Sequence, residues 1–182
     1  MIGLIDYYWE FKKGKTNFLR PLDYQLETAK EILKKNYGSI PKNFVGMHLR
    51  VSKDEKSVRN INKLSAKYAV EQLTLHNLDC YLIGTKSFFE KKKSSLYEFL
   101  RYKNVFDTTK LKLSKFEREC LQIYIWSHSR FFIGSKSGGT NPAGTFGIPT
   151  IWLDTHPNID FRSPNRLDHI LPKRVFSYKK DR

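Results

Sequence analysis

The hydrophobic and polar positions change their period repeatedly along the chain, and each change marks an expected helix or strand. Residues 24–36 carry apolar side chains at helical spacing, with one face formed by Leu26, Ala29, Ile32 and Leu33. Other stretches are short apolar runs rich in β-favouring residues and bounded by Gly, Pro or polar residues, which is typical of buried strands. These expected strands span residues 44–49, 79–84, 104–107, 130–134 and 148–153.

Helical segments lie between the expected strands. The clearest helix start is Ser114-Lys-Phe-Glu117, in which a serine followed three residues later by a glutamate forms a capping-box pattern. The regular alternation predicts an α/β fold of Rossmann-like type, with a mainly parallel sheet of about five strands and helices on both faces. The expected crossover helices span residues 64–76, 94–102, 114–127 and 139–146.

Length and composition are those of a single globular core. With 182 residues, 40% of them hydrophobic, the chain can bury about two-thirds of its unfolded surface. We expect the α/β domain over residues 44–182, preceded by an N-terminal segment of residues 1–43 with one helix. From Asp154 onward we expect loop with at most one short element. No apolar run approaches the ~20 residues that span a bilayer, and the first residues lack the order of a secretory signal, which predicts a cytoplasmic protein.

A formal net charge of +15 is the strongest feature of the composition. Such a charge attracts nucleic acid, acidic membrane lipids and charged small substrates alike, and lysine-rich chains can carry it without binding any of them. Because Lys and Arg are spread over the chain and do not cluster with aromatic residues, we expect no nucleic acid partner. Cys80 and Cys120 lie in apolar stretches outside any CxxC pair, so we expect buried thiols and no metal site.

The residues that follow the strands are candidates for ligand binding, because open parallel sheets bind ligands at the carboxyl ends of their strands. Gly84 ends the expected strand of residues 79–84. A Gly/Ser turn, residues 134–141, follows the expected strand of residues 130–134. In that turn glycines let a ligand approach the backbone, hydroxyls donate hydrogen bonds, and the N–H groups of a helix start favour a phosphate. The alternative is a helix start that needs small residues only to turn tightly; the GxxxxGK[ST] and GxGxxG spacings are both absent. The candidates in the turn are Ser135, Ser137, Gly138, Gly139, Thr140 and Asn141.

A second candidate stands at the end of the first expected strand, in the sequence MHLR. Side chains alternate along a strand, so His48 and Arg50 project on one face and can clamp a phosphate, with Arg50 supplying a planar fork of donors. Each also has a plainer interpretation, as a hydrogen-bonded core histidine and as a solvated surface arginine. Arg59 and Asn60, in the following loop, add a further cation and an amide.

Together these segments resemble the donor-binding domain of GT-B-type glycosyltransferases. The resemblance rests on VGMHLR, VRN and SRFFIGSKSGGTNPAGTFGIPTIWLD, which follow the pattern HxR…RN…FxxGxxSG…FGxPT of a bacterial glycosyltransferase family. A more distant similarity runs to fucosyltransferases with an HxR motif. The resemblance covers roughly residues 44–153 and is most specific in its last block. It implies a nucleotide-sugar donor as substrate, two facing Rossmann-like domains, and transfer without a metal or other cofactor.

The resemblance also assigns roles. It implies contacts of His48 and Arg50 with the donor phosphates, and a glycan or lipid-linked acceptor in bacterial polysaccharide or surface glycan synthesis, with the protein peripheral to the inner face of the membrane. Residues 1–43 then represent a remnant of, or a linker to, a missing acceptor domain. The general base is unassigned, with His48 and Asp54 as candidates. The residues implied to line the phosphate or sugar site are Ser135, Ser137, Gly138 and Gly139.

Two other functions stay open. The net charge of +15 is also compatible with a nucleic-acid or anionic-surface binding module, although no recognition helix, RNP-like strand or zinc pair supports one. A catalytically silent remnant that only binds nucleotide is the other alternative.

Overall fold

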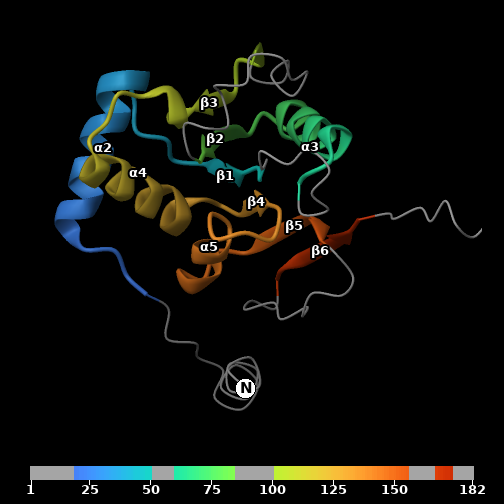
Figure 1. Cartoon of the computed structure of the whole chain (residues 1–182). Helices are drawn as coiled ribbons and strands as arrows, with labels where there is room; N and C mark the ends of the chain where they lie inside the picture. The colour runs from blue at the N-terminus through green and yellow to red at the C-terminus, as the bar shows by residue number, and fades with distance from the viewer. Residues whose placement is uncertain (1–18, 51–59, 85–100, 156–166, 174–182) are drawn as a thin grey trace, which may run out of the picture.

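A parallel sheet organises the chain. The computed structural model describes residues 19–50, 60–84, 101–155 and 167–173. Within them six strands form one sheet in the order β3-β2-β1-β4-β5-β6, with every neighbouring pair parallel (Figure 1). The strands are β1 (Phe44–His48), β2 (Asp79–Ile83), β3 (Val105–Asp107), β4 (Phe132–Gly134), β5 (Thr150–Thr155) and β6 (His169–Pro172). The helices are α2 (Asp23–Tyr37), α3 (Lys63–Leu75), α4 (Lys115–His128) and α5 (Asn141–Thr145), with a 3-10 turn η3 (Thr108–Lys110).

The predicted Rossmann-like α/β class is confirmed, with one strand more than expected. The first five strands coincide with the apolar runs to within a few residues at each end. The additional strand, β6, lies in the C-terminal part of the chain, where we expected loop with at most one short element. The helix predicted over residues 94–102 falls largely outside the described residues.

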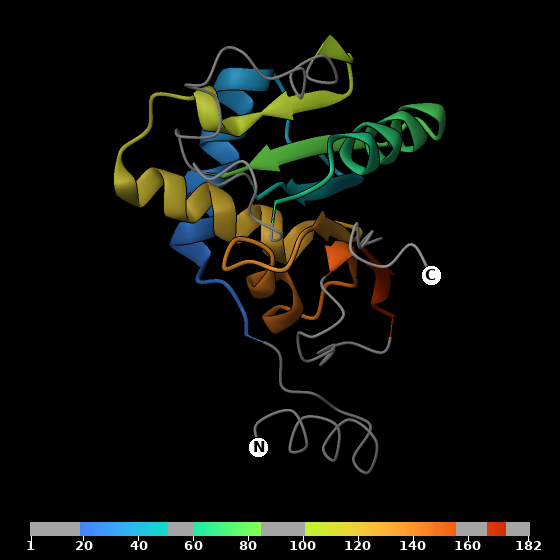
Figure 2. The same cartoon turned by 45° about the vertical axis from the view of Figure 1, so that its right-hand side comes forward.

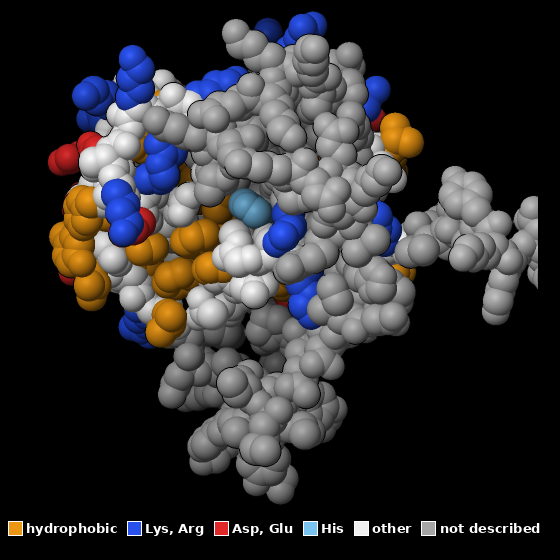
Figure 3. All heavy atoms as spheres, viewed as in Figure 1, with side chains coloured by type: hydrophobic (Ala, Val, Ile, Leu, Met, Phe, Trp, Pro, Cys, Tyr) orange, Lys and Arg blue, Asp and Glu red, His pale blue; other side chains and the backbone are white. Residues whose placement is uncertain are grey.

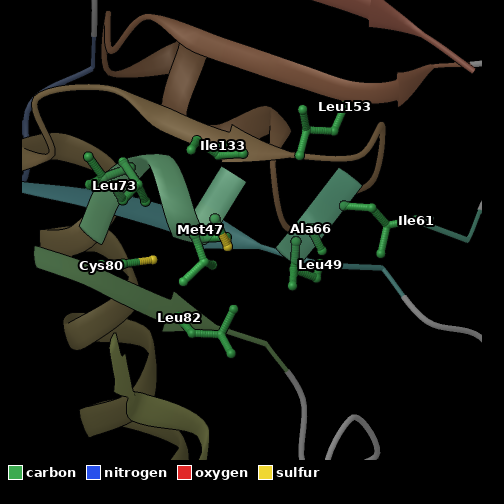
Figure 4. Close-up of a cluster of buried hydrophobic side chains, with 11 residues drawn as sticks. Met47, Leu49, Ile61, Ala66, Leu73, Cys80, Leu82, Ile133 and Leu153 are labelled. Carbon is green, nitrogen blue, oxygen red and sulfur yellow. The ribbon is translucent and has the colours of Figure 1, made fainter. Parts of the chain in front are cut away.

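Alternation along the buried strands divides the core into two layers, one on each face of the sheet. On one face α3 packs over a cluster that includes Met47, Leu82 and Ile133 (Figure 4). On the other face α2 and α4 lie side by side (Figures 1 and 2), over a layer that includes the aromatic rings of Phe44 and Tyr81. Helices therefore cover both faces of the sheet, as predicted.

Helix α2 is part of this core although it precedes the boundary expected at residue 44. Its apolar stripe, Ala29, Ile32 and Leu33, is buried in the layer that α4 also covers. Gly38 ends the helix with a φ of 79°, a left-handed conformation that glycine adopts without strain. Whether residues 1–43 are a remnant or a linker stays a prediction.

The starts of α4 and α3 are held by side chains. The predicted capping box of α4 is present: Glu117 N donates to Ser114 Oγ (3.2 Å), and Ser114 N donates to Glu117 Oε2 (2.8 Å). At α3, the Asn62 N–H donates to Asp154 Oδ2 (2.6 Å), and the Ser65 hydroxyl donates to Asp154 Oδ1 (3.1 Å). The carboxylate of Asp154, near the end of β5, thus holds the start of α3.

Surface features bear on possible partners. In Figure 3, Lys and Arg side chains are spread over the visible face of the described residues instead of forming one stripe. None of the helices in the described ranges combines the length and apolar character needed to cross a bilayer. Cys80 and Cys120 are free and buried, as expected, and burial raises the pKa of Cys80 to about 12.

Candidate functional site

The two candidate segments meet at the carboxyl ends of β1 and β4. These strands are neighbours, with His48 paired in register with Gly134. From β1 the chain proceeds outward to β2 and β3, and from β4 it proceeds the opposite way to β5 and β6. The β1–β4 pair is therefore the switch point of the sheet, where open α/β folds bind their ligands.

Two hydrogen bonds join the end of β1 to the Gly/Ser turn, and two more lie within the turn. The Arg50 N–H donates to Ser135 Oγ (3.3 Å), and Ser137 Oγ lies 3.0 Å from His48 Nδ1. Inside the turn, Thr140 Oγ1 donates to the Ser135 carbonyl (2.8 Å) and lies 3.3 Å from Ser137 Oγ. The structure thus brings the two candidate segments together; their roles toward a ligand stay predictions.

His48 is half-buried and neutral at physiological pH. Burial, helped by the nearby positive charge of Arg50, lowers the pKa of His48 to about 4. A neutral imidazole can form hydrogen bonds but adds no positive charge to a phosphate site. This modifies the predicted clamp, because only Arg50 of the pair can supply its charge.

Arg50 has an unused donor. The side chain is half-buried, and its Nε atom is buried without a hydrogen-bond partner among the described residues. A buried guanidinium nitrogen with no partner is unfavourable by itself and is stabilised by an anion, which a guanidinium can bind through two parallel hydrogen bonds. An incoming phosphate would supply the missing acceptor.

Gly138 and Gly139 form the open part of the turn. Gly138 is exposed, and a Cβ atom built there meets nothing within 4 Å. At Gly139, by contrast, a Cβ atom would overlap the His48 ring, so only glycine allows the turn to lie against the histidine. Within the described part of the chain, the N–H groups of both glycines donate no hydrogen bond. They are available to an anion.

The hydroxyl groups of the turn point inward. Ser135 and Ser137 are buried, and Thr140 is fully buried, with every hydroxyl engaged in the bonds given above. These side chains therefore stabilise the turn from inside and do not line its outer surface. Asn141 is exposed, and its N–H donates to the Ser137 carbonyl (3.2 Å). Helix α5 has only five residues, so the helix dipole that the sequence suggested as an anion-binding element contributes little.

The remaining candidates lie around this centre. A Cβ atom on Gly84 would stand 3.9 Å from His48 Cδ2, so Gly84 flanks the histidine ring. Asn60 is buried, and its carbonyl accepts a hydrogen bond from Lys173 Nζ (2.7 Å), which ties the loop after β1 to the end of β6. Arg59 and Asp54 lie outside the described residues.

Trp126 is a positioning residue that the sequence did not reveal. Its indole Nε1 donates to the Gly139 carbonyl (2.9 Å) from the last turn of α4. Nothing in the local sequence pattern distinguishes a tryptophan that holds a turn from one that fills the core. The bond fixes the peptide group between Gly139 and Thr140.

The chain resembles solved glycosyltransferase structures. No protein-family model matches it, and no curated protein matches it. The glycosyl transferase family 9 protein from Veillonella parvula superposes with a TM-score of 0.62 at 12% identity, covering 85% of this chain and 41% of that chain. E. coli heptosyltransferase WaaC superposes with TM-scores of 0.48 with ADP and 0.49 with ADP-2-deoxy-2-fluoro heptose, both at 13% identity. These alignments cover 87% and 90% of this chain, and 51% and 46% of WaaC.

At 12% identity, the likeness to the family 9 protein shows a shared fold. The predicted similarity to GT-B-type glycosyltransferases thus holds at the level of the fold, while the sequence pattern and the fucosyltransferase similarity stay predictions. The chain spans about half the length, or less, of the structures that it matches.

Proposed function

We propose that this chain is the donor-binding half of a glycosyltransferase, which moves a sugar from a nucleotide-sugar to a glycan or lipid-linked acceptor. The proposal rests on one observation. Arg50, with a buried Nε that has no partner among the described residues, is anchored to the Gly/Ser turn whose Gly138 and Gly139 N–H groups are open. This arrangement lies at the switch point of the sheet and is suited to a diphosphate.

The chemistry of sugar transfer requires donors of this kind. Breaking the bond between the sugar and the diphosphate develops negative charge on the leaving nucleotide. Preorganised N–H groups and a guanidinium stabilise that charge, because they are already oriented before the bond breaks. We assign this role to Arg50 and the glycine N–H groups, and we propose transfer without a metal ion.

The shared fold with a glycosyltransferase of family 9 supports the proposal, and the length of that protein indicates what else is needed. Because this chain covers 41% of that structure, a second domain that binds the acceptor is part of the proposal. We place the reaction in bacterial surface glycan synthesis at the inner face of the membrane. There the net charge of +15 would attract acidic lipids.

A nucleotide panel tests the proposal. The apparent melting temperature of the chain is measured with GDP, UDP, ADP and CMP over a range of concentrations, and we expect at least one to raise it in proportion to its affinity. Arg50→Ala should weaken that nucleotide about 10- to 100-fold, since a hydrogen bond to a charged group contributes about 1.5–3 kcal/mol.

Arg130→Ala is the matched control. Arg130 is exposed and precedes β4, at the opposite edge of the sheet, so its loss removes the same charge away from the site. It should leave the affinity unchanged. Equal weakening by both variants would indicate nonspecific attraction of anions by a basic surface, and absence of stabilisation by every nucleotide would refute the proposal.

A further inference from the structure

The Nδ1 atom of His48 is hydrogen-bonded to a chain of hydroxyl groups, whereas its Nε2 atom has no hydrogen-bond partner among the described residues. We infer that His48 Nε2 accepts a hydrogen bond from a hydroxyl group of the bound ligand, beside the place where Arg50 and the glycine turn hold phosphate. This subsite rests on the proposed function, since it assigns a second chemical group of the same ligand.

The direction of the hydrogen bonds determines which nitrogen carries the proton. Thr140 has a single hydroxyl hydrogen, which it donates to the Ser135 carbonyl at 2.8 Å. The contact of 3.3 Å between Thr140 Oγ1 and Ser137 Oγ is then a hydrogen bond only if Ser137 donates. Ser137 has no second hydrogen, so His48 Nδ1, at 3.0 Å, must donate to Ser137 Oγ. A neutral imidazole protonated at Nδ1 has its lone pair on Nε2.

The opposite arrangement satisfies fewer groups. If Ser137 donated to His48 Nδ1, no hydrogen would lie between the Ser137 and Thr140 hydroxyl oxygens, although both residues are buried. A buried polar contact without its hydrogen bond is costly, and hydrogen bonds that run in one direction strengthen one another. The continuous relay from His48 through Ser137 and Thr140 to the Ser135 carbonyl is therefore the favoured state.

The ring surroundings leave Nε2 to a ligand. Gly84 and Gly139 flank the ring, and neither carries a side chain that could bond to it. Among the described residues, no hydrogen bond reaches Nε2. A lone pair disfavours phosphate oxygens, which are acceptors too, whereas a hydroxyl can donate to it. In a nucleotide-sugar, both the ribose and the transferred sugar present hydroxyls.

Two substitutions distinguish the role of His48 Nδ1 from that of His48 Nε2. In His48→Asn the side-chain amide replaces Nδ1 and can still donate to Ser137, but no acceptor remains at the Nε2 position. In His48→Gln the amide group lies near the Nε2 position, where its oxygen can accept. Affinities are measured by calorimetry for UDP, GDP and ADP, for UDP-glucose, GDP-mannose and ADP-glucose, and for the 2′,3′-dideoxy form of each diphosphate.

We expect His48→Asn to weaken the nucleotide-sugar that binds wild type about 3- to 10-fold, as for the loss of one hydrogen bond, and His48→Gln to recover part of it. A loss confined to the nucleotide-sugars places the hydroxyl on the transferred sugar. If His48→Asn also weakens the diphosphate, but does not weaken its dideoxy form, the hydroxyl lies on the ribose. Equal binding of every ligand by wild type and His48→Asn would overturn the inference, whereas a wild-type chain that binds no nucleotide would instead refute the proposed function.

The tautomer is tested without any ligand. Long-range proton–nitrogen correlation spectra of the 15N-labelled chain at neutral pH should show His48 protonated at Nδ1. In Thr140→Val the relay ends, Ser137 is freed to donate to Nδ1, and the proton should shift toward Nε2. Protonation of Nε2 in the wild-type chain would exclude an acceptor there, whether or not nucleotides bind.

Discussion

The end of β3 and the paired ends of β1 and β4 are polar turns at the same edge of a parallel sheet, but they use their hydrogen-bonding groups differently. After β3, Asp107 Oδ1 accepts from the N–H of Thr109 (3.1 Å) and from its hydroxyl (2.6 Å). Asp107 Oδ2 lies 3.2 Å from Lys110 Nζ, and Thr108 Oγ1 donates to the Leu82 carbonyl (2.7 Å). The donors of this turn thus have acceptors in the turn or in β2. Asp107 Oδ2 has an ion-pair partner but, among the described residues, no hydrogen bond.

At the switch point the balance is different. The hydroxyls of Ser137 and Thr140 form the hydrogen bonds that hold the turn against His48. Arg50 Nε and the N–H groups of the two glycines, by contrast, have no hydrogen-bond acceptor among the described residues. The two turns are similar in polarity and position. Polar residues at the ends of strands therefore do not by themselves indicate a binding site. Hydrogen-bond donors without an acceptor, located at the switch point, are the better indication.

Protonating the histidine should disturb the switch point most. Burial and Arg50 lower the pKa of His48 to about 4 from 6.5. Between these values the unfolded chain binds a proton that the folded chain does not, so the free energy of unfolding should decrease as the pH falls through this range. The full loss is about 3 kcal/mol, and it is absent above the unfolded pKa. Urea unfolding at pH 7 and pH 4.5 measures this change in the free energy of unfolding. The change should be smaller in His48→Asn. Identical differences in the two proteins would contradict this expectation.

Adding a methyl group to the glycine turn should have the next largest effect. In Gly139→Ala the new Cβ overlaps the His48 ring and must displace it from Ser137, so we expect a loss of about 2 kcal/mol in the free energy of unfolding. Gly138→Ala adds the same atom to open space and should change it by less than about 0.5 kcal/mol. Chemical denaturation of both variants checks the pair, and equal losses would show that the close approach of Gly139 to the His48 ring is not the cause.

Removing the carboxylate after β3 should have the smallest effect and should sharpen the contrast between the turns. Asp107→Ala deletes the acceptor for the Thr109 N–H, and the loss of a cap costs about 1 kcal/mol of stability. Nucleotide affinity should change less than twofold, because no donor of the switch point depends on Asp107. Calorimetric titration alongside Arg50→Ala gives the comparison. A loss of affinity as large as that of Arg50→Ala would extend the site to the end of β3.

Local patterns were sufficient to predict most of the fold. The capping box at Ser114 and Glu117, the apolar stripe of α2 and the buried runs of the first five strands depend on residues close together in the chain, where propensity and period act directly. The short β6 strand was not assigned, because its residues are largely exposed and it is stabilised by pairing with β5. The boundary at residue 44 excluded α2 because burial against α4 cannot be inferred from α2 alone.

The candidate site was predicted in position but not in chemistry. The MHLR and Gly/Ser segments were both selected because they follow strands, and they do converge. The neutral state of His48, the inward direction of the hydroxyls and the bond from Trp126 to Gly139 were not foreseen. Each depends on which groups surround an atom in space, and sequence spacing carries little information about that.

The α/β alternation, the small residues of the turn, and the histidine and arginine at the end of one strand are all readable from short segments of the chain. The pairing of β1 with β4, by contrast, is a property of the assembled sheet. That pairing also sets which donors have acceptors among the described residues, because the bonds concerned join residues 85 and 89 positions apart. Contacts across such separations form when the whole sheet assembles, and burial then sets the charge of His48 and leaves Arg50 Nε without a partner among the described residues.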